Sequence, residues 1–142
     1  MDQVPIHPFL VHFPIGGWLI GTALLWIGVV KKKNDWLNAS WACLGIAAVM
    51  TVPAVLAGQS AIADFQGTWP PELVRHQQIG TLIPFLMVGL LLIKVHTLFK
   101  KDAKKPPEWT LALLASIVAI LVIYAGLLGG KLVYLLGAGS RG

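Results

Sequence analysis

The chain has 142 residues, of which 56% are hydrophobic and only 12% are charged. A soluble domain carries about 25% charged residues, so this composition excludes a soluble globular protein and predicts a single integral membrane domain over residues 1–142. The formal net charge is +5. Most of the lysines cluster in two short stretches, which indicates membrane topology and argues against nucleic-acid binding. The single Cys43 excludes an internal disulfide and a cysteine-based metal cluster.

Four apolar segments follow one another along the chain, at about residues 8–30, 36–58, 77–99 and 109–128. Each is close to the ~20 residues that cross about 30 Å of hydrocarbon. Backbone groups in lipid must bond within their own segment, so we expect an all-α, integral membrane four-helix bundle in contact with lipid. Prolines predict kinks or helix ends inside the first three segments, at Pro14, Pro53 and Pro84. No internal repeat is evident.

The loops between these segments predict the orientation. Residues 31–33 are three lysines that join the first two segments, and residues 100–105 hold four more lysines between the last two. The positive-inside rule places both stretches in the cytoplasm. We therefore expect a multi-pass protein of the bacterial inner membrane with both termini on the outer side.

Three of the four histidines, His7, His12 and His76, then share the outer side. Ligating groups at membrane depth suggest function, and neutral imidazoles from two helices can hold one haem. We expect His12 and His76 to ligate the iron of a haem b near the outer surface. His7 or Arg75 would lie beside a propionate. The alternative is that each imidazole is an interfacial side chain with its tip in water or headgroups.

The spacing of the histidines sets limits on this site. His7 and His12 are five residues apart, which does not place two ligands on one helix face. His7 also precedes Pro8 and is expected just outside the first helix. His96 has no second histidine at its depth, so we expect a single haem, with His96 and Lys94 as side chains that snorkel to the inner interface. The last segment is rich in small residues that permit close helix packing, and we expect a neighbouring helix against Gly126, Gly129 and Gly130.

Three parts of the sequence resemble a bacterial membrane family called domain of unknown function 2231. They are the stretch from His7 to Gly16 (HPFLVHFPIG), the lone His76 that opens the third segment, and the stretch from Gly129 to Gly139 (GGKLVYLLGAG). The resemblance implies a four-helix membrane domain with His7, His12, His76 and the Gly-Gly-x-Leu-Val-Tyr stretch as marked positions. Members of this family are often encoded near, or fused to, c-type cytochromes and other redox proteins. The resemblance therefore also implies a redox partner of this kind and a distant likeness to di-haem cytochrome b bundles. The chain departs from the family at Asp64, because an acidic residue is expected closer to Gly58.

The function expected from these features is electron transfer. A membrane haem b protein or subunit would pass electrons between quinol, or another partner, and an outer-face c-type cytochrome, with quinone as a second possible cofactor. One alternative is a cofactor-free anchor subunit of a larger redox or photosynthetic complex. Another is an outer-face metal-handling protein in which Asp64 and Glu72 join the histidines. No hydrolase or transferase motif is present. We therefore expect the protein to be at most an electron-transfer component of an enzyme.

Overall fold

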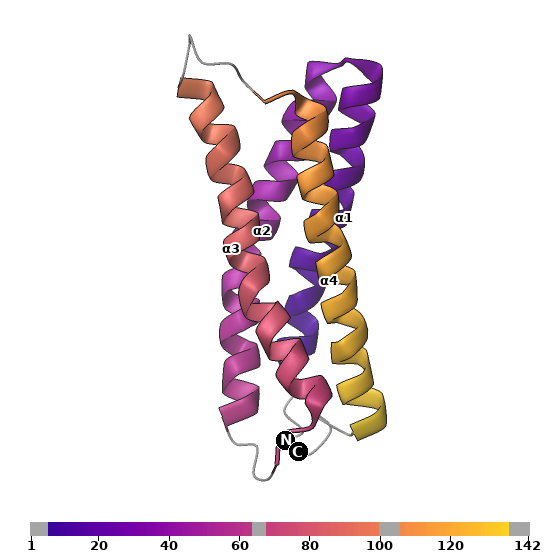
Figure 1. Ribbon diagram of the computed structural model, residues 1–142, viewed down its shortest axis with the longest axis vertical. Coiled ribbons are helices and arrows are strands. Elements are labelled where there is room, and N and C mark those ends of the chain that lie inside the picture. The colour runs from indigo at the N-terminus through magenta and orange to yellow at the C-terminus, as the bar shows by residue number, and fades with distance from the viewer. Residues whose placement is uncertain (1–5, 64–67, 100–105, 137–142) are drawn as a thin grey trace.

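The computed structural model describes residues 6–63, 68–99 and 106–136. Four helices run side by side in alternating directions (Figure 1). Their bounds are α1 Ile6–Lys31, α2 Asn34–Ala63, α3 Pro71–Phe99 and α4 Glu108–Leu136. Each helix is long and apolar enough to cross a membrane. The expected all-α four-helix membrane fold is therefore confirmed.

The helices are longer than the apolar segments of the sequence. α3 begins at Pro71, because the Pro70 carbonyl accepts hydrogen bonds from the Leu73 and Val74 amides and proline is favoured in a first helical turn. α4 continues past Leu128 to Leu136. The internal prolines do not divide the helices, which are continuous through Pro14, Pro53 and Pro84.

A two-residue turn joins α1 to α2. The Lys33 amide donates to the Gly28 carbonyl at 3.2 Å, and Lys32 between them has a left-handed φ of 51°. These are the features of a Schellman cap, which normally carries glycine at the left-handed position. The cap reverses the chain directly, so α1 and α2 form a tight antiparallel hairpin.

Glycines of α1 bring its backbone close to α2. A Cβ atom added at Gly21 would lie 2.8 Å from Leu44 Cγ, and one added at Gly28 would lie 2.6 Å from Leu37 Cδ2. Such distances are shorter than normal carbon contacts, so a larger residue at either position would force the facing leucine to move. Small residues at helix interfaces are the usual device for close packing in membranes, and here they hold the first hairpin together.

Around the bundle, α1 and α3 each pack against both α2 and α4. Among the described residues, no Cα atom of α1 lies within 8 Å of one in α3, and the same is true of α2 and α4. α1 and α3 therefore occupy diagonal positions. The core between the helices is apolar, and its largest fully buried side chains include Trp18, Leu25, Leu44, Met87 and Leu111.

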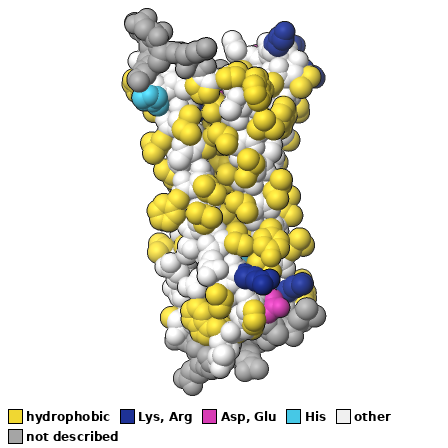
Figure 2. All heavy atoms as spheres, in the orientation of Figure 1, with side chains coloured by type: hydrophobic (Ala, Val, Ile, Leu, Met, Phe, Trp, Pro, Cys, Tyr) yellow, Lys and Arg dark blue, Asp and Glu magenta, His cyan; other side chains and the backbone are white. Residues whose placement is uncertain are grey.

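The outer surface of the bundle is also apolar. Hydrophobic side chains cover most of the visible face between the two ends, while charged side chains lie toward the ends (Figure 2). The exposed side chains are spread over all four helices and include Ile20, Ile46, Phe85, Leu92, Ile120 and Leu127. A soluble protein rarely exposes so continuous an apolar surface, so this surface is suited to lipid.

Candidate functional site: a histidine pair at one end of the bundle

Two histidines meet at the end of the bundle where α1 and α3 begin, hereafter called the histidine end. His7 is the second residue of α1, and His76 lies in the second turn of α3. Their ring centroids are 6.3 Å apart and the ring planes are inclined at 77°. Both side chains are partly buried. Because α1 and α3 lie on a diagonal, this pair is a contact that spans the bundle.

Each ring of this histidine pair is fixed by a backbone carbonyl of a neighbouring helix. His7 Nδ1 lies 2.8 Å from the Ala54 carbonyl oxygen of α2, and His76 Nδ1 lies 3.0 Å from the Ala125 carbonyl oxygen of α4. A carbonyl oxygen only accepts hydrogen bonds, so each Nδ1 must carry the hydrogen. In the neutral ring the lone pair then lies on Nε2. This is the arrangement that orients metal-binding histidines in proteins.

The other predicted site residues lie apart from this contact. His12 is exposed, and its Nδ1 lies 2.6 Å from the Pro8 carbonyl oxygen of its own helix. The structure thus pairs His76 with His7, and His12 has no part in that contact. A separation of five residues turns a helix by about 140°, so His7 and His12 face different directions. Arg75, one residue before His76, is exposed.

No third side chain completes a multi-ligand metal site in the part of the chain that the structure describes. Within residues 6–63, 68–99 and 106–136, no group of three or more His, Cys, Asp or Glu side chains could hold one ion. Glu72 therefore does not join the histidine pair in such a group. Asp64, the other carboxylate considered from the sequence, lies outside the described residues.

The glycines of α4 do not behave alike. A Cβ atom added at Gly126 would lie 3.8 Å from Ile15 Cδ1 of α1, and one added at Gly129 would lie 3.1 Å from His76 Cε1 of α3. The prediction that these two glycines face a neighbouring helix is confirmed. It is wrong for Gly130, whose added Cβ atom would meet nothing within 4 Å.

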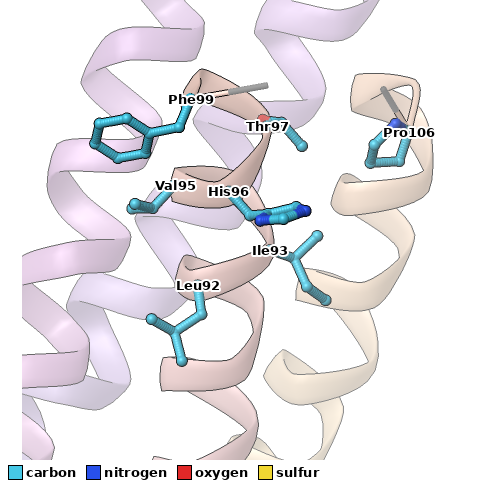
Figure 3. Close-up of a pocket in the computed structure, with 7 residues that line it drawn as sticks. All are labelled: Leu92, Ile93, Val95, His96, Thr97, Phe99 and Pro106. Atoms are coloured by element: carbon cyan, nitrogen blue, oxygen red, sulfur yellow. The ribbon is translucent and has the colours of Figure 1, made fainter. Parts of the chain in front are cut away.

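The opposite end of the bundle, next to Lys31–Lys33, is called the lysine end. A shallow apolar groove lies there between α3 and the start of α4, lined by Leu92, Ile93, Val95, His96, Thr97, Phe99 and Pro106 (Figure 3). The His96 side chain is exposed and extends from α3 into this groove. His96 is thus far from the histidine pair, as expected from its spacing along α3.

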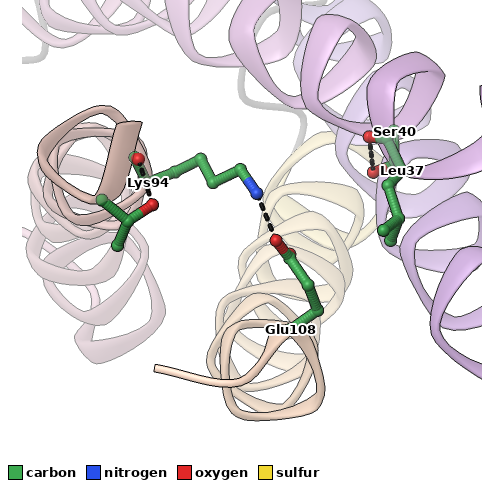
Figure 4. Close-up of polar contacts among 5 residues, drawn as sticks. Leu37, Ser40, Lys94 and Glu108 are labelled. Atoms are coloured by element: carbon green, nitrogen blue, oxygen red, sulfur yellow. Dashed lines mark hydrogen bonds and ion pairs between the residues drawn. The ribbon is translucent and has the colours of Figure 1, made fainter. Parts of the chain in front are cut away.

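Lys94 lies at the same end of α3 as His96. Its ammonium group forms an ion pair with a Glu108 carboxylate oxygen, which links α3 to the first turn of α4 (Figure 4). The same ammonium group lies 5.0 Å from the centre of the Trp41 ring of α2. A cation over an aromatic face is attracted by the ring quadrupole. Lys94 therefore joins three helices at the lysine end.

The residues that hold the two imidazoles were not predicted from the sequence. Ala54 and Gly58 in α2 contact His7, while Ala125 and Gly129 in α4 contact His76. The available signal was the same short pattern, alanine followed four residues later by glycine, near the end of both α2 and α4. That pattern is common in membrane helices, so it had no specific meaning until the histidines were placed beside it.

Comparisons with known proteins were made over the whole chain. No curated protein and no solved structure matches it significantly. A family model described as "Predicted membrane protein (DUF2231)" matches residues 3–142, which is nearly the entire sequence. Together with the four membrane-length helices, this match shows that the chain belongs to the DUF2231 family of predicted membrane proteins.

Proposed function

We propose that the protein is a membrane haem b protein, or a subunit of one, in which His7 and His76 would hold the haem iron. This pair takes the place of His12 and His76, the pair expected from the sequence. The observation that carries the proposal is the meeting of two imidazoles from diagonal helices, each with its Nδ1 hydrogen bonded to a carbonyl and its Nε2 left for a ligand.

The separation of the rings supports this choice of ligand. A metal–nitrogen bond to imidazole is about 2 Å long, and each nitrogen lies about 1 Å from its ring centre. Two imidazoles on opposite sides of one ion therefore have centroids about 6 Å apart, against 6.3 Å here. Ligands at a tetrahedral angle would bring the centroids to about 5 Å. The 77° between the ring planes is compatible with axial ligation, because each ring can turn about its own metal–nitrogen bond.

The number of protein ligands also favours haem over a bare ion. Zinc sites use three or four protein ligands, whereas a porphyrin brings four nitrogens of its own and needs only two from the protein. Two histidines suffice for haem, and the described residues provide no group of three metal ligands. Arg75, exposed beside His76, is available to pair with a propionate carboxylate.

Such a protein would act as an electron carrier. A haem held by His7 and His76 would supply one-electron transfer. The chain's own residues hold the two imidazoles in one orientation and surround them with apolar helices. The exposed residues of the histidine end would admit a c-type cytochrome or another redox partner, and the surrounding bilayer would supply quinol.

The test is the visible spectrum of the purified protein after reduction. We expect the Soret and α bands of a low-spin, bis-histidine haem in the wild type. His7→Ala and His76→Ala should each abolish this spectrum, whereas His12→Ala and His96→Ala should retain it, because neither side chain contacts the pair.

Other outcomes would contradict the proposal in different ways. A colourless protein made in haem-supplied cells, with bound metal detected by elemental analysis, would indicate the metal-handling alternative. A colourless, metal-free protein that copurifies with a larger complex would indicate an anchor subunit. An unchanged spectrum in both His7→Ala and His76→Ala would place the haem elsewhere.

A further inference from the structure

The two imidazoles at the histidine end are held by the same structural device, repeated once in each helical hairpin. In the first hairpin His7 of α1 contacts α2, and in the second His76 of α3 contacts α4. In both cases the carbonyl acceptor belongs to an alanine, and a glycine follows four residues later. The chain thus repeats the order of a histidine-bearing helix and an alanine–glycine helix, although no sequence repeat is evident.

Physical reasons explain why glycine stands at this position. A helical side chain leans back over the turn that precedes it, so the residue four positions after a carbonyl covers that carbonyl from the side. Glycine leaves the carbonyl open. The carbonyl has two lone pairs, so it can accept an imidazole Nδ1–H as well as its helical partner.

The contacts of the two rings with the two glycines are closely alike. A Cβ atom added at Gly58 would lie 2.8 Å from His7 Cε1 and 3.1 Å from its Nδ1. One added at Gly129 would lie 3.1 Å from His76 Cε1 and 3.6 Å from its Nδ1. In both rings Cε1 is the nearest atom, Nδ1 the second and Nε2 the third. The same edge of each imidazole therefore rests on each glycine.

We infer that Ala54–Gly58 and Ala125–Gly129 are two equivalent imidazole receptors. Gly58 and Gly129 are positioning residues that fix the Nδ1–H tautomer of His7 and His76 and leave both Nε2 lone pairs available to a ligand. The identity of that ligand rests on the function proposed above. The tautomer and the ring orientation do not, because they follow from the protein alone.

Alanine substitutions with matched controls test this inference. Gly58→Ala and Gly129→Ala would each place a methyl group against an imidazole, whereas Gly45→Ala in α2 and Gly130→Ala in α4 would meet nothing within 4 Å. Alanine favours helix more than glycine does, so a selective loss in the first two variants cannot come from helix propensity. Gly129→Ala has the longer contact and is the milder of the two.

The first readout is the histidine tautomer in the full-length protein without haem, measured by ¹⁵N NMR well above the ordinary imidazole pKa of about 6.5. The signals can be assigned with single His→Gln variants. We expect the Nδ1–H form for His7 and His76 in the wild type. Gly58→Ala should change the His7 signal alone and Gly129→Ala the His76 signal alone, while both control variants should match the wild type.

The second readout is haem affinity, measured by titration of the same proteins. Loss of a group that orients a metal-binding histidine typically weakens the site about 10- to 100-fold, and we expect this for Gly58→Ala and Gly129→Ala only. If all four variants match the wild type in tautomer and affinity, the receptor inference is wrong. If the tautomers change as expected but neither the wild type nor any variant binds haem, the receptor inference is supported and the proposed haem function is wrong.

Discussion

Trp18 is one of two tryptophans of α1 whose indole N–H donates a hydrogen bond to α4. Its side chain is fully buried, and Nε1 donates a hydrogen bond of 3.0 Å to the Ala115 carbonyl oxygen. A buried indole N–H normally needs such a partner. The bond also joins two helices that belong to different hairpins, so Trp18 contributes to the relative position of the hairpins and of their two histidines.

Replacement of Trp18 by phenylalanine removes this hydrogen bond and leaves a small cavity. We expect a loss of about 1–3 kcal/mol in the free energy of unfolding, from the bond and the lost packing together. Trp109, which is 52% exposed, provides the control, since Trp109→Phe should change stability little. Thermal unfolding in detergent, followed by circular dichroism, measures both. Equal stability of the two variants would show that the hydrogen bond to Ala115 contributes nothing.

At the residue scale, the sequence predicted His12 and His76 as partners, whereas the structure brings His7 and His76 together. His7 was expected outside the helix because it precedes Pro8, yet α1 begins at Ile6 and includes it. Once His7 is helical, the turn of about 140° between it and His12 allows only one of them to face His76. A pattern of histidine positions cannot decide which, because the rotation of α1 is set by its glycine contacts with α2.

At the scale of the elements, the four helices were predictable because their apolar length is a direct consequence of the bilayer thickness. Their ends were not, since polar residues at the interface can extend a helix beyond the apolar stretch. α3 thus gains the turn that begins at Pro71, and α4 continues through Gly129 to Leu136. This extension carries Gly129 as a helical residue to a position beside His76, which the apolar pattern alone could not indicate.

The first three helices each continue through an internal proline. Pro14, Pro53 and Pro84 were expected to kink their helices or to bound shorter ones, and none of the three ends its helix. In a membrane the carbonyl four residues before a proline, which loses its helical donor, can be satisfied by neighbouring helices and local adjustment. Breaking the helix would expose several more backbone groups to lipid, so the continuous helix is the lower-energy choice.

For the molecule as a whole, the orientation in the membrane is a prediction that can be tested directly. Ser60 lies at the histidine end of α2 and Asn34 at its lysine end, and both are exposed. In a Cys43→Ser background, a cysteine at position 60 should react with a membrane-impermeant reagent in intact cells, whereas one at position 34 should react only after lysis, because lysine-rich loops stay in the cytoplasm. The reverse result would place the histidine pair on the cytoplasmic side.

The position of the histidine pair has an electrical consequence. His7 and His76 lie about 2 and 8 Å from the starts of helices that are about 40 Å long. A charge that enters this site from the nearby water crosses no more than roughly a fifth of the membrane field. Moving one elementary charge across the whole membrane costs or releases about 2.3 kcal/mol per 100 mV. Moving it to this site therefore changes its energy by at most about 0.5 kcal/mol per 100 mV. If the proposed haem is present, a diffusion potential imposed on sealed vesicles should therefore shift its midpoint potential by no more than about a fifth of the applied voltage. A shift near one half would place the centre in the middle of the bilayer. Electron exchange at this site would thus take place on one side of the membrane and generate almost no voltage of its own.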